Sequence, residues 1–259
     1  MRWYKIKALM FRDMKIFSRS KWRFMEFFYF PVTTIIIWGL FAIFAREFSA
    51  EAGLMVLAVN VFWSFSYLAQ STTNMQINED HWSGSFRQVM SSGFTEFEYI
   101  FARIITSTVV SVIVMAVMLV VSYFFGLTIV FEKGWEVLVL SGITLFGSVA
   151  LSILVAALII FLGREYSFLA WTILQVFVLL SAPLYPLDIL PEALQYVAYA
   201  MPFTSIFVGV RDLINTGSVS PSVYFSGIGV ILVYFVVSIP LYYYSFRRAQ
   251  RNGMLARMF

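Results

Sequence analysis

The pattern of apolar and polar positions along the chain predicts a bundle of membrane-spanning helices. A helix needs about 20 apolar residues to cross the hydrocarbon core of a bilayer. Six apolar stretches come close to this length: 27–45, 52–72, 104–125, 135–162, 166–182 and 223–246. The fifth is short because it ends at Pro183, and the fourth is long enough to tilt. The expected fold class is therefore all-α integral membrane, with six transmembrane helices in a single domain over residues 1–259.

Composition argues against a soluble domain. Of the 259 residues, 61% are hydrophobic and only 12% are charged, and the mean hydropathy is +0.84. A soluble domain of this length needs more charge to cover its surface. The chain has no cysteine, which rules out disulfides and thiolate metal sites.

The distribution of basic residues predicts the orientation of the chain in the membrane. Of the 18 Lys and Arg residues, all but Arg46, Lys133 and Arg211 fall on the side that carries both predicted termini. Cytoplasmic segments are enriched in Lys and Arg, so we expect a multi-pass protein of the cell membrane (plasma or inner) with both termini in the cytoplasm. The surplus positive charge then suits contact with anionic membrane lipids, and no nucleic-acid partner is expected.

Residues 1–24 predict an amphipathic helix that lies in the membrane interface. The apolar side chains that recur at helical spacing are Trp3, Ile6, Met10, Met14 and Phe17. The first span begins only after this charged arm and no small-residue cleavage pattern follows, so we do not expect a cleavable signal. Two interpretations stay open: a simple anchor and orientation signal, or an elbow helix that transmits motion from a cytoplasmic partner.

The connection between the second and third spans, residues 76–96, contains the pattern of a short surface helix. Asn78, Glu79 and Asp80 are its expected N-terminal cap, because short polar side chains accept the free amide protons of a first turn. An apolar stripe follows, and Ser-Ser-Gly at 91–93 is expected to stop the helix. A second helix is predicted to open near Thr95, with acidic residues at its positive end. The alternative interpretation is a well-capped loop.

Four of the seven prolines lie close together after the fifth span. Proline removes a backbone donor and clashes with the preceding turn, so this segment cannot run as one continuous helix. Broken backbone at membrane depth survives only where it is buried in protein or lines a cavity. We therefore predict a re-entrant helical hairpin over residues 183–215 on the outer side of the membrane. Its candidate outer-gate residues are Pro183, Tyr185, Pro186, Leu190, Pro191, Tyr196 and Pro202.

Two motif regions, together with the length and the expected topology, give the chain a resemblance to a known family. The first region holds Asp80, Gly-Ser-Phe-Arg at 84–87, an apolar pair at 89–90 and Ser-Gly at 92–93. The second holds Tyr-Pro at 185–186, Leu-Pro at 190–191, Met-Pro-Phe-Thr at 201–204 and Arg-Asp at 211–212. The chain resembles the permease subunit of ABC-2-type ATP-binding-cassette exporters, with Arg87 in place of an acid and Gly93 in place of a proline.

The resemblance implies partners and a site where one of them binds. The partners would be a second copy of this chain and two copies of an ATP-binding-cassette ATPase subunit, which would hold ATP and Mg²⁺. The residues implied to couple this chain to the ATPase are Glu79, Asp80, His81, Trp82, Gly84, Ser85, Phe86 and Arg87.

Several kinds of chemistry are missing from the sequence. No Gly-x-x-x-x-Gly-Lys-Ser/Thr phosphate loop occurs, so we expect no ATPase activity in this chain and no cofactor of its own. His81 is the only histidine and no cluster has metal-ligand spacing, so neither a metal site nor a catalytic residue is expected. None of the predicted spans has an ionisable residue near its centre, which argues against a proton-coupled transporter.

Polar residues inside the spans suggest a substrate path. Asn60 and Gln175 are costly to expose to lipid, so we expect them at a helix interface or a pore. With Trp63 and Tyr67 they would form an amphipathic wall for a drug-like hydrophobe, a lipid or a lipid-linked glycan. Close helix packing and ordinary aromatic belts explain the same residues. A heme- or polysaccharide-specific permease, a secondary transporter and a membrane enzyme acting on lipids remain the alternatives.

Overall fold

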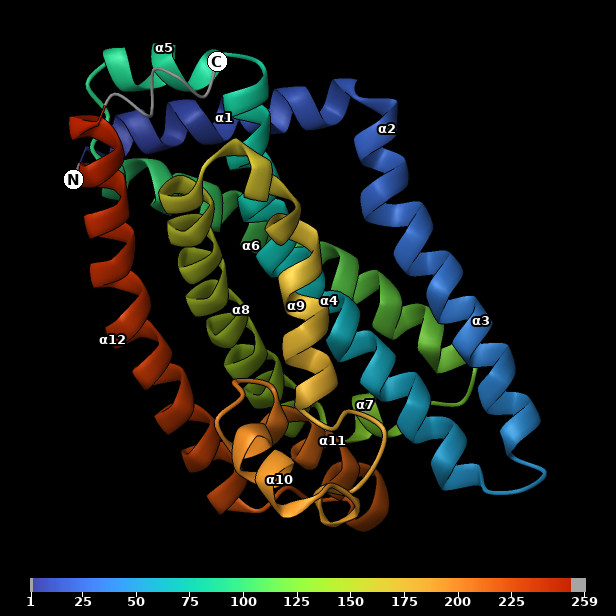
Figure 1. The fold of residues 1–259 in the computed structure, drawn as a ribbon. Coiled ribbons are helices and arrows are strands. Elements are labelled where there is room, and N and C mark those ends of the chain that lie inside the picture. The colour runs from blue at the N-terminus through green and yellow to red at the C-terminus, as the bar shows by residue number, and fades with distance from the viewer. Residues whose placement is uncertain (1, 253–259) are drawn as a thin grey trace.

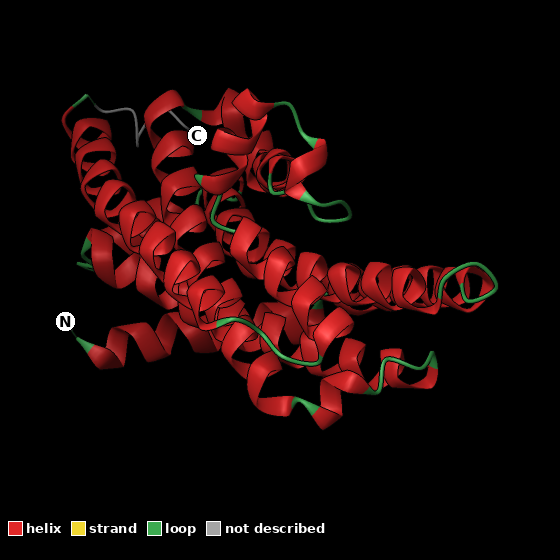
Figure 2. Cartoon of the chain, turned by 90° about the horizontal axis from the view of Figure 1, so that it is seen from below, coloured by secondary structure: helices red, strands yellow, loops and turns green. Residues whose placement is uncertain are grey.

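The computed structural model describes residues 2–252, and all regular elements in that range are helical (Figure 2). The all-α prediction is therefore confirmed. Its α-helices are α1 (Trp3–Arg19), α2 (Lys21–Phe24), α3 (Phe30–Ala45), α4 (Ala50–Trp82), α5 (Ser85–Ser91), α6 (Glu96–Phe124), α7 (Ile129–Glu132), α8 (Gly134–Leu162), α9 (Leu169–Leu180), α10 (Glu192–Tyr199), α11 (Thr204–Thr216) and α12 (Pro221–Arg251). A π-helical turn covers Met25–Tyr29, and 3₁₀ turns cover Arg164–Phe168 and Leu187–Ile189.

The long helices run side by side, and short helices cover the two ends of the bundle (Figure 1). Helices α1 and α5 lie across one end, where α1 crosses the direction of the long helices. Helices α10 and α11 lie at the opposite end. We call these the α1 end and the α10 end. The two motif regions of the sequence are thus separated by the length of the bundle.

Five helical segments of the described chain are long and apolar enough to cross a membrane. They are Phe27–Ala45, Glu51–Trp82, Glu96–Phe124, Gly134–Leu162 and Pro221–Arg251. Helices α10 and α11 meet at a bend of 96° and count as a sixth candidate only if taken as one broken span. The stretch expected to be the fifth span contains α9, whose 12 residues rise only about 18 Å at 1.5 Å per residue. The structure thus supports five to six membrane-spanning candidates, and the predicted span over 166–182 is present only as a shorter apolar helix.

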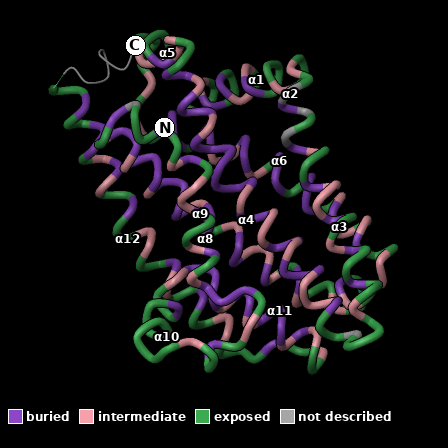
Figure 3. Tube along the Cα trace, turned by 45° about the vertical axis from the view of Figure 1, so that its right-hand side comes forward, coloured by how far each residue is buried: buried purple, intermediate pink, exposed green. Residues whose placement is uncertain are grey.

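Burial divides the long helices into inner and outer ones (Figure 3). In the apolar windows of α4 and α8, 61% of residues are buried, compared with 28% for the first span and 17% for α12. The exposed side chains of the outer helices are large and apolar, for example Ile37 on α3 and Val236 on α12. Such faces suit contact with lipid, because lipid tails are as apolar as these side chains.

The first span begins with a π-helical turn, and a proline explains its position. Pro31 has no backbone N–H, so it cannot donate to the carbonyl four residues earlier, at Phe27. Single π turns accommodate such a break without ending the helix. The chain thereby turns from the α1 end into α3 over a few residues (Figure 1).

The connection between α4 and α6 differs from the prediction at one point. Asn78, Glu79 and Asp80 do not cap a new helix, because α4 continues to Trp82 and contains all three. The short helix α5 begins only at Ser85, after Gly84 has turned the chain with a φ of 70°. Later boundaries are confirmed. Helix α5 ends at Ser91, and Thr95 caps α6 in a capping box with Glu98.

Candidate functional site

A cavity of about 630 Å³ opens between α3, α4 and the α9 region. Aromatic and aliphatic side chains form most of its wall, and none of the described residues that line it is charged. Its lining consists of Phe30, Pro31, Thr34, Trp38, Val56, Val59, Asn60, Trp63, Ser64, Tyr67, Leu68, Met75, Trp171, Gln175 and Leu184. A wall of this kind, apolar with a few hydrogen-bonding groups, is typical of small-molecule sites.

The four residues predicted to form a substrate path all line this cavity. Asn60, Trp63 and Tyr67 come from successive turns of α4, and Gln175 comes from α9. Trp63 Nε1 donates a hydrogen bond of 3.1 Å to Gln175 Oε1, which joins the two helices across the cavity. The Oδ1 atom of Asn60 is buried and accepts no hydrogen bond from the described protein. The cavity therefore offers a free acceptor among aromatic rings.

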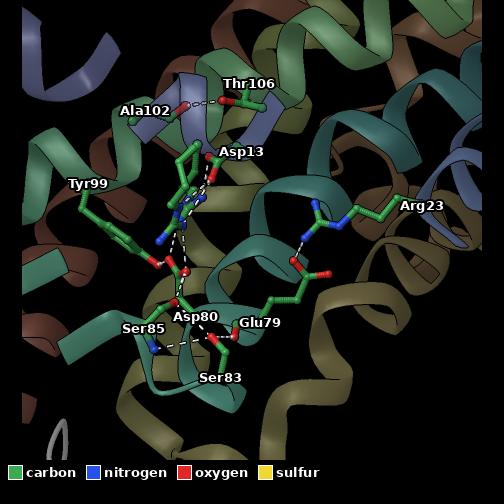
Figure 4. A network of polar contacts seen from close by, with 11 residues as sticks. Asp13, Arg23, Glu79, Asp80, Ser83, Ser85, Tyr99, Ala102 and Thr106 are labelled. Atoms are coloured by element: carbon green, nitrogen blue, oxygen red, sulfur yellow. Dashed lines mark hydrogen bonds and ion pairs between the residues drawn. The ribbon is translucent and has the colours of Figure 1, made fainter. Parts of the chain in front are cut away.

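A second cluster of polar side chains lies at the α1 end, where buried charges join three helices (Figure 4). Arg103 of α6 is only 1% exposed and binds Asp13 of α1 and Asp80 of α4. Arg12 of α1 donates to Asp80 Oδ1 at 2.8 Å and to Asp13 Oδ1 at 3.2 Å. Two arginines and two aspartates balance one another, which is the condition under which charges can be buried. We call these four residues the charge cluster.

Two hydroxyl groups complete the hydrogen bonds of Asp80. Tyr99 Oη donates to Asp80 Oδ2 at 2.8 Å, and Ser85 Oγ donates to Asp80 Oδ1 at 2.7 Å (Figure 4). The carboxylate expected to cap a helix through its backbone amides instead binds side chains from three other helices. Its neighbour Glu79 forms an ion pair with Arg23, which ties α4 to α2. Asp80 therefore anchors the start of α5 to the charge cluster.

A further set of contacts attaches the first turn of α1 to the start of α6. Arg2 binds both carboxylate oxygens of Glu98, with Nε at 3.1 Å and Nη2 at 2.9 Å. Lys5 Nζ donates to the carbonyl oxygens of Ser92 and Gly93, both at 2.8 Å. The hydrogen bond to the Glu98 carboxylate raises the pKa of Arg2 above its ordinary value. Helix α1 is thus held to the bundle along much of its length.

The eight residues predicted to couple the chain to a partner fall into buried and exposed groups. Asp80, His81 and Phe86 are buried, and Phe86 packs between the rings of His81, Tyr99 and Phe246 at centroid distances of 4.4, 5.2 and 6.1 Å. His81, which the resemblance implies is part of the ATPase contact, is therefore not at the surface of this chain. Its ring is 5% exposed because α4 continues past it and α5 folds back over it.

Two of the other predicted coupling residues contribute to an exposed surface on and beside α5. Trp82 is 45% exposed and Arg87 is exposed, whereas Glu79, Gly84 and Ser85 are partly covered. The adjacent exposed residues are Ser83, Gln88 and Ser91. We call Trp82, Ser83, Arg87, Gln88 and Ser91 the α5 face.

The predicted outer-gate residues lie together at the α10 end, far from the α5 face (Figure 1). Pro183 and Pro202 are buried, and Tyr185 and Leu190 pack on a small core of Ala182, Leu187 and Ala198. The other predicted members, Pro186, Pro191 and Tyr196, are exposed. Sequence reasoning noted Arg211 as a topology marker and as part of the second motif region, without a structural role. Its Nη1 donates to the carbonyl oxygens of Ala182 at 2.8 Å and Tyr185 at 2.7 Å, which holds the proline segment to α11.

Sequence reasoning did not identify Asp13 or Arg103 as functional residues. The signal available was the position of Asp13 in an arm that otherwise holds only basic charged residues. An acid among so many basic residues departs from the charge pattern of the arm. Such a residue is a candidate for an ion pair inside the folded chain. The residues of the predicted apolar stripe in the arm do not share one environment. Ile6 packs into the bundle, whereas Trp3 and Met14 are exposed.

The described residues contain no group of histidine, cysteine or acidic side chains able to hold a metal ion. The described residues combine an uncharged cavity between helices, short helices across the α1 end and a broken segment at the α10 end. A comparison with curated proteins gives no match. A family model described as ABC-2 type transporter matches residues 4–215, which include all but the first residue of α1, the cavity and both motif regions. The chain belongs to the ABC-2 type transporter family and is a multi-pass membrane component of such a transporter.

Proposed function

We propose that this chain is the permease subunit of an ATP-driven exporter that moves an amphipathic molecule out of the cytoplasm or the inner leaflet. The observation that carries the proposal is the uncharged, aromatic cavity between α3, α4 and α9. Its volume of about 630 Å³ is in the range of sites that hold a drug-sized ligand.

The lining of the cavity favours a particular class of cargo. Trp38, Trp63 and Trp171 offer flat apolar surface, while Asn60 and Gln175 offer hydrogen bonds at a few points. A charged molecule would find no opposite charge among the described lining residues, and burying it would cost free energy. A hydrophobe with a neutral polar group, a lipid or a lipid-linked glycan fits this wall best.

The cavity also supports a homodimer. Its lining includes the exposed side chain of Gln175 on α9, which is the fifth span under this proposal. Exposed amide groups are costly in lipid, so this wall needs protein or water in front of it. A second copy of the chain, which presents the same wall, would enclose one shared path between two subunits.

The α5 face is the proposed contact for an ATP-binding-cassette ATPase, with two ATPase copies for two permease copies. ATP and Mg²⁺ would bind to those subunits. Because Phe86 and Asp80 connect α5 to α4, α6 and α1, a push on the α5 face would reach the helices around the cavity. Under this proposal the α1 end and both termini are cytoplasmic, α9 is the fifth span, and the α10 end is a re-entrant outer gate.

A transport experiment tests the cargo site and the motor contact separately. The chain and its ATPase are reconstituted in vesicles, and ATP-dependent movement of a fluorescent amphipath is measured. Trp63→Ala is expected to reduce transport about tenfold while ATPase binding stays intact, because it removes an aromatic wall and the bond to Gln175.

Trp82→Ala is expected to reduce ATPase binding itself. The matched control is Trp135→Ala, since Trp135 is 74% exposed and begins α8, away from the α5 face. Normal transport by Trp63→Ala would contradict the cargo site. Equal ATPase binding by Trp82→Ala and Trp135→Ala would contradict the α5 contact.

A further inference from the structure

Three amide side chains share one face of α4 in its half nearest the α1 end. Gln70, Asn74 and Asn78 follow one another at four-residue spacing, so their side chains lie one above another along the helix. The exposed fractions of these residues are 0%, 0% and 1%. Polar groups of this kind are rare in an apolar interior unless hydrogen bonds satisfy them.

Each of the three amide nitrogens donates one hydrogen bond, and two of these bonds reach the start of the α9 region. Gln70 Nε2 donates to the carbonyl oxygen of Ala170 at 3.2 Å, and Asn78 Nδ2 donates to that of Ser167 at 2.9 Å. Asn74 Nδ2 donates to the carbonyl oxygen of Gln70 at 3.1 Å. A carbonyl oxygen can only accept, so the amide nitrogen must face it in all three cases.

Their acceptors are not used by the protein. Gln70 Oε1, Asn74 Oδ1 and Asn78 Oδ1 are all buried and accept no hydrogen bond from the described residues. A buried acceptor without a partner costs about 1–3 kcal/mol. Three such losses in successive turns are large beside a net folding stability of about 5–15 kcal/mol. This face of α4 is therefore suited to bind a small ligand that donates hydrogen bonds to the three amide oxygens.

The charge of the ligand distinguishes water from a metal cation at this site. Amide oxygens accept hydrogen bonds from water and also coordinate metal cations. A buried cation needs a negative partner, but the nearest carboxylates along α4 are already paired. Glu79 binds Arg23, and Asp80 binds Arg103 and Arg12. Water carries no charge, and a buried water typically satisfies about three polar groups.

We propose that Gln70, Asn74 and Asn78 bind a row of ordered water molecules between α4 and α9, here called the water track. Asn60 in the cavity carries another unpaired acceptor on α4, about 15 Å from Gln70 at 1.5 Å per residue. A contact that already holds water separates at less cost than a dry polar contact, because its amide groups keep hydrogen-bonding partners. The α4–α9 contact is thus the part of the cavity wall best suited to open.

Hydroxyl-radical labelling in lipid nanodiscs tests for this water directly. Radicals formed from bound water oxidise neighbouring methionines, whereas methionines in dry cores are protected. Leu174→Met places a reporter on α9 one turn from Ala170, and Leu151→Met places a control on α8. Both positions are 0% exposed, and Leu→Met exchanges conserve volume, so both variants are expected to fold. The reporter is expected to oxidise at least about fivefold faster than the control.

A second substitution, Asn74→Leu, gives an independent sign. If water satisfies Asn74, Asn74→Leu lowers the Tm and slows oxidation of the Leu174→Met reporter. If the contact is dry, the same change removes an unpaired acceptor and raises the Tm. Equal oxidation of the two reporters, or a raised Tm, would overturn the proposal.

A salt series separates water from a bound cation. Stabilisation by sodium or potassium chloride beyond that by N-methylglucamine chloride would assign the site to a cation and overturn the water track. Equal melting in the three salts supports it. None of these measurements needs ATP, an ATPase or cargo, so their outcome is independent of the proposed transport function.

Discussion

Arg103 on α6 and Asp13 on α1, 90 residues apart in the chain, form an ion pair whose side chains are only 1% and 3% exposed. The pair fixes the N-terminal helix to a membrane-spanning helix. A simple surface anchor would need no buried charge. The arrangement favours the second interpretation of the arm, an elbow helix that transmits motion from a cytoplasmic partner.

The charge cluster is expected to be essential for stability as a unit. Asp13→Ala leaves Arg103 buried with one carboxylate fewer, so we expect the free energy of unfolding to fall by about 3–5 kcal/mol. Arg103→Lys is expected to be nearly as harmful, because one ammonium group cannot bind two carboxylates as a guanidinium does. Thermal unfolding in detergent, followed by tryptophan fluorescence, measures both changes.

The matched control for the charge cluster is an exposed ion pair. Arg247 lies 3.9 Å from Glu96 and is about half exposed, so Arg247→Ala is expected to cost less than about 1 kcal/mol. A similar small loss for Asp13→Ala would show that the buried cluster contributes no more than a surface pair.

Phe86 is expected to act through packing and not through contact with a partner. Phe86→Ala empties a site enclosed by His81, Tyr99 and Phe246, and we expect a loss of about 3–5 kcal/mol. Phe131→Ala is the control, because that ring is 54% exposed. If Phe86→Ala weakened ATPase binding at an unchanged Tm, Phe86 would be a contact residue after all.

Gly39 is expected to be required where α3 meets the end of α6. A Cβ atom at Gly39 would lie 2.4 Å from Cγ of Phe125, so the ring would have to move. We expect Gly39→Ala to lower the Tm even though alanine favours helices by about 1 kcal/mol over glycine. In a Phe125→Ala background the same change should be neutral or stabilising, as a double-mutant cycle will show.

Gly142 is the control for this prediction. A Cβ atom there meets nothing within 4 Å, so Gly142→Ala is expected to raise the stability by up to about 1 kcal/mol. Identical responses at Gly39 and Gly142 would contradict the close contact with Phe125.

The cysteine-free chain allows a clean test of topology. Ser91→Cys on the α5 face and Ser218→Cys before α12 both introduce an exposed thiol. In intact cells, an impermeant maleimide is expected to label Ser218→Cys alone. In inside-out vesicles it is expected to label Ser91→Cys alone. Labelling of both from one side would exclude the proposed orientation and the use of α9 as a span.

Much of the fold could be predicted because its determinants are local. Apolar stretches define the long helices, and the capping box at Thr95 and Glu98 marks the start of α6 within a few residues. The same reasoning failed at Asp80, whose pattern is equally typical of a cap. Its actual partners, Arg103 and Tyr99, lie 23 and 19 residues later in the chain. A single sequence does not show which distant side chain will compete for a carboxylate.

The candidate site, too, could be predicted only in part from the sequence. Asn60, Trp63, Tyr67 and Gln175 could be predicted to share one interior surface, because polar groups in apolar segments avoid lipid, and all four line one cavity. The sequence did not predict that Phe86 would be buried. Its burial depends on α5 folding back over the end of α4, which the left-handed turn at Gly84 allows.

Glu98 takes part in two structures at once. Its carboxylate accepts from the backbone amide of Thr95 and also binds Arg2, while the hydroxyl of Thr95 accepts from the amide of Glu98. Drawing α1 away would remove the guanidinium that orients this carboxylate and so loosen the first turn of α6. Fraying at the start of α6 is thereby linked to the docking of α1. A force that displaces α1 would therefore change how many residues at the start of α6 are helical.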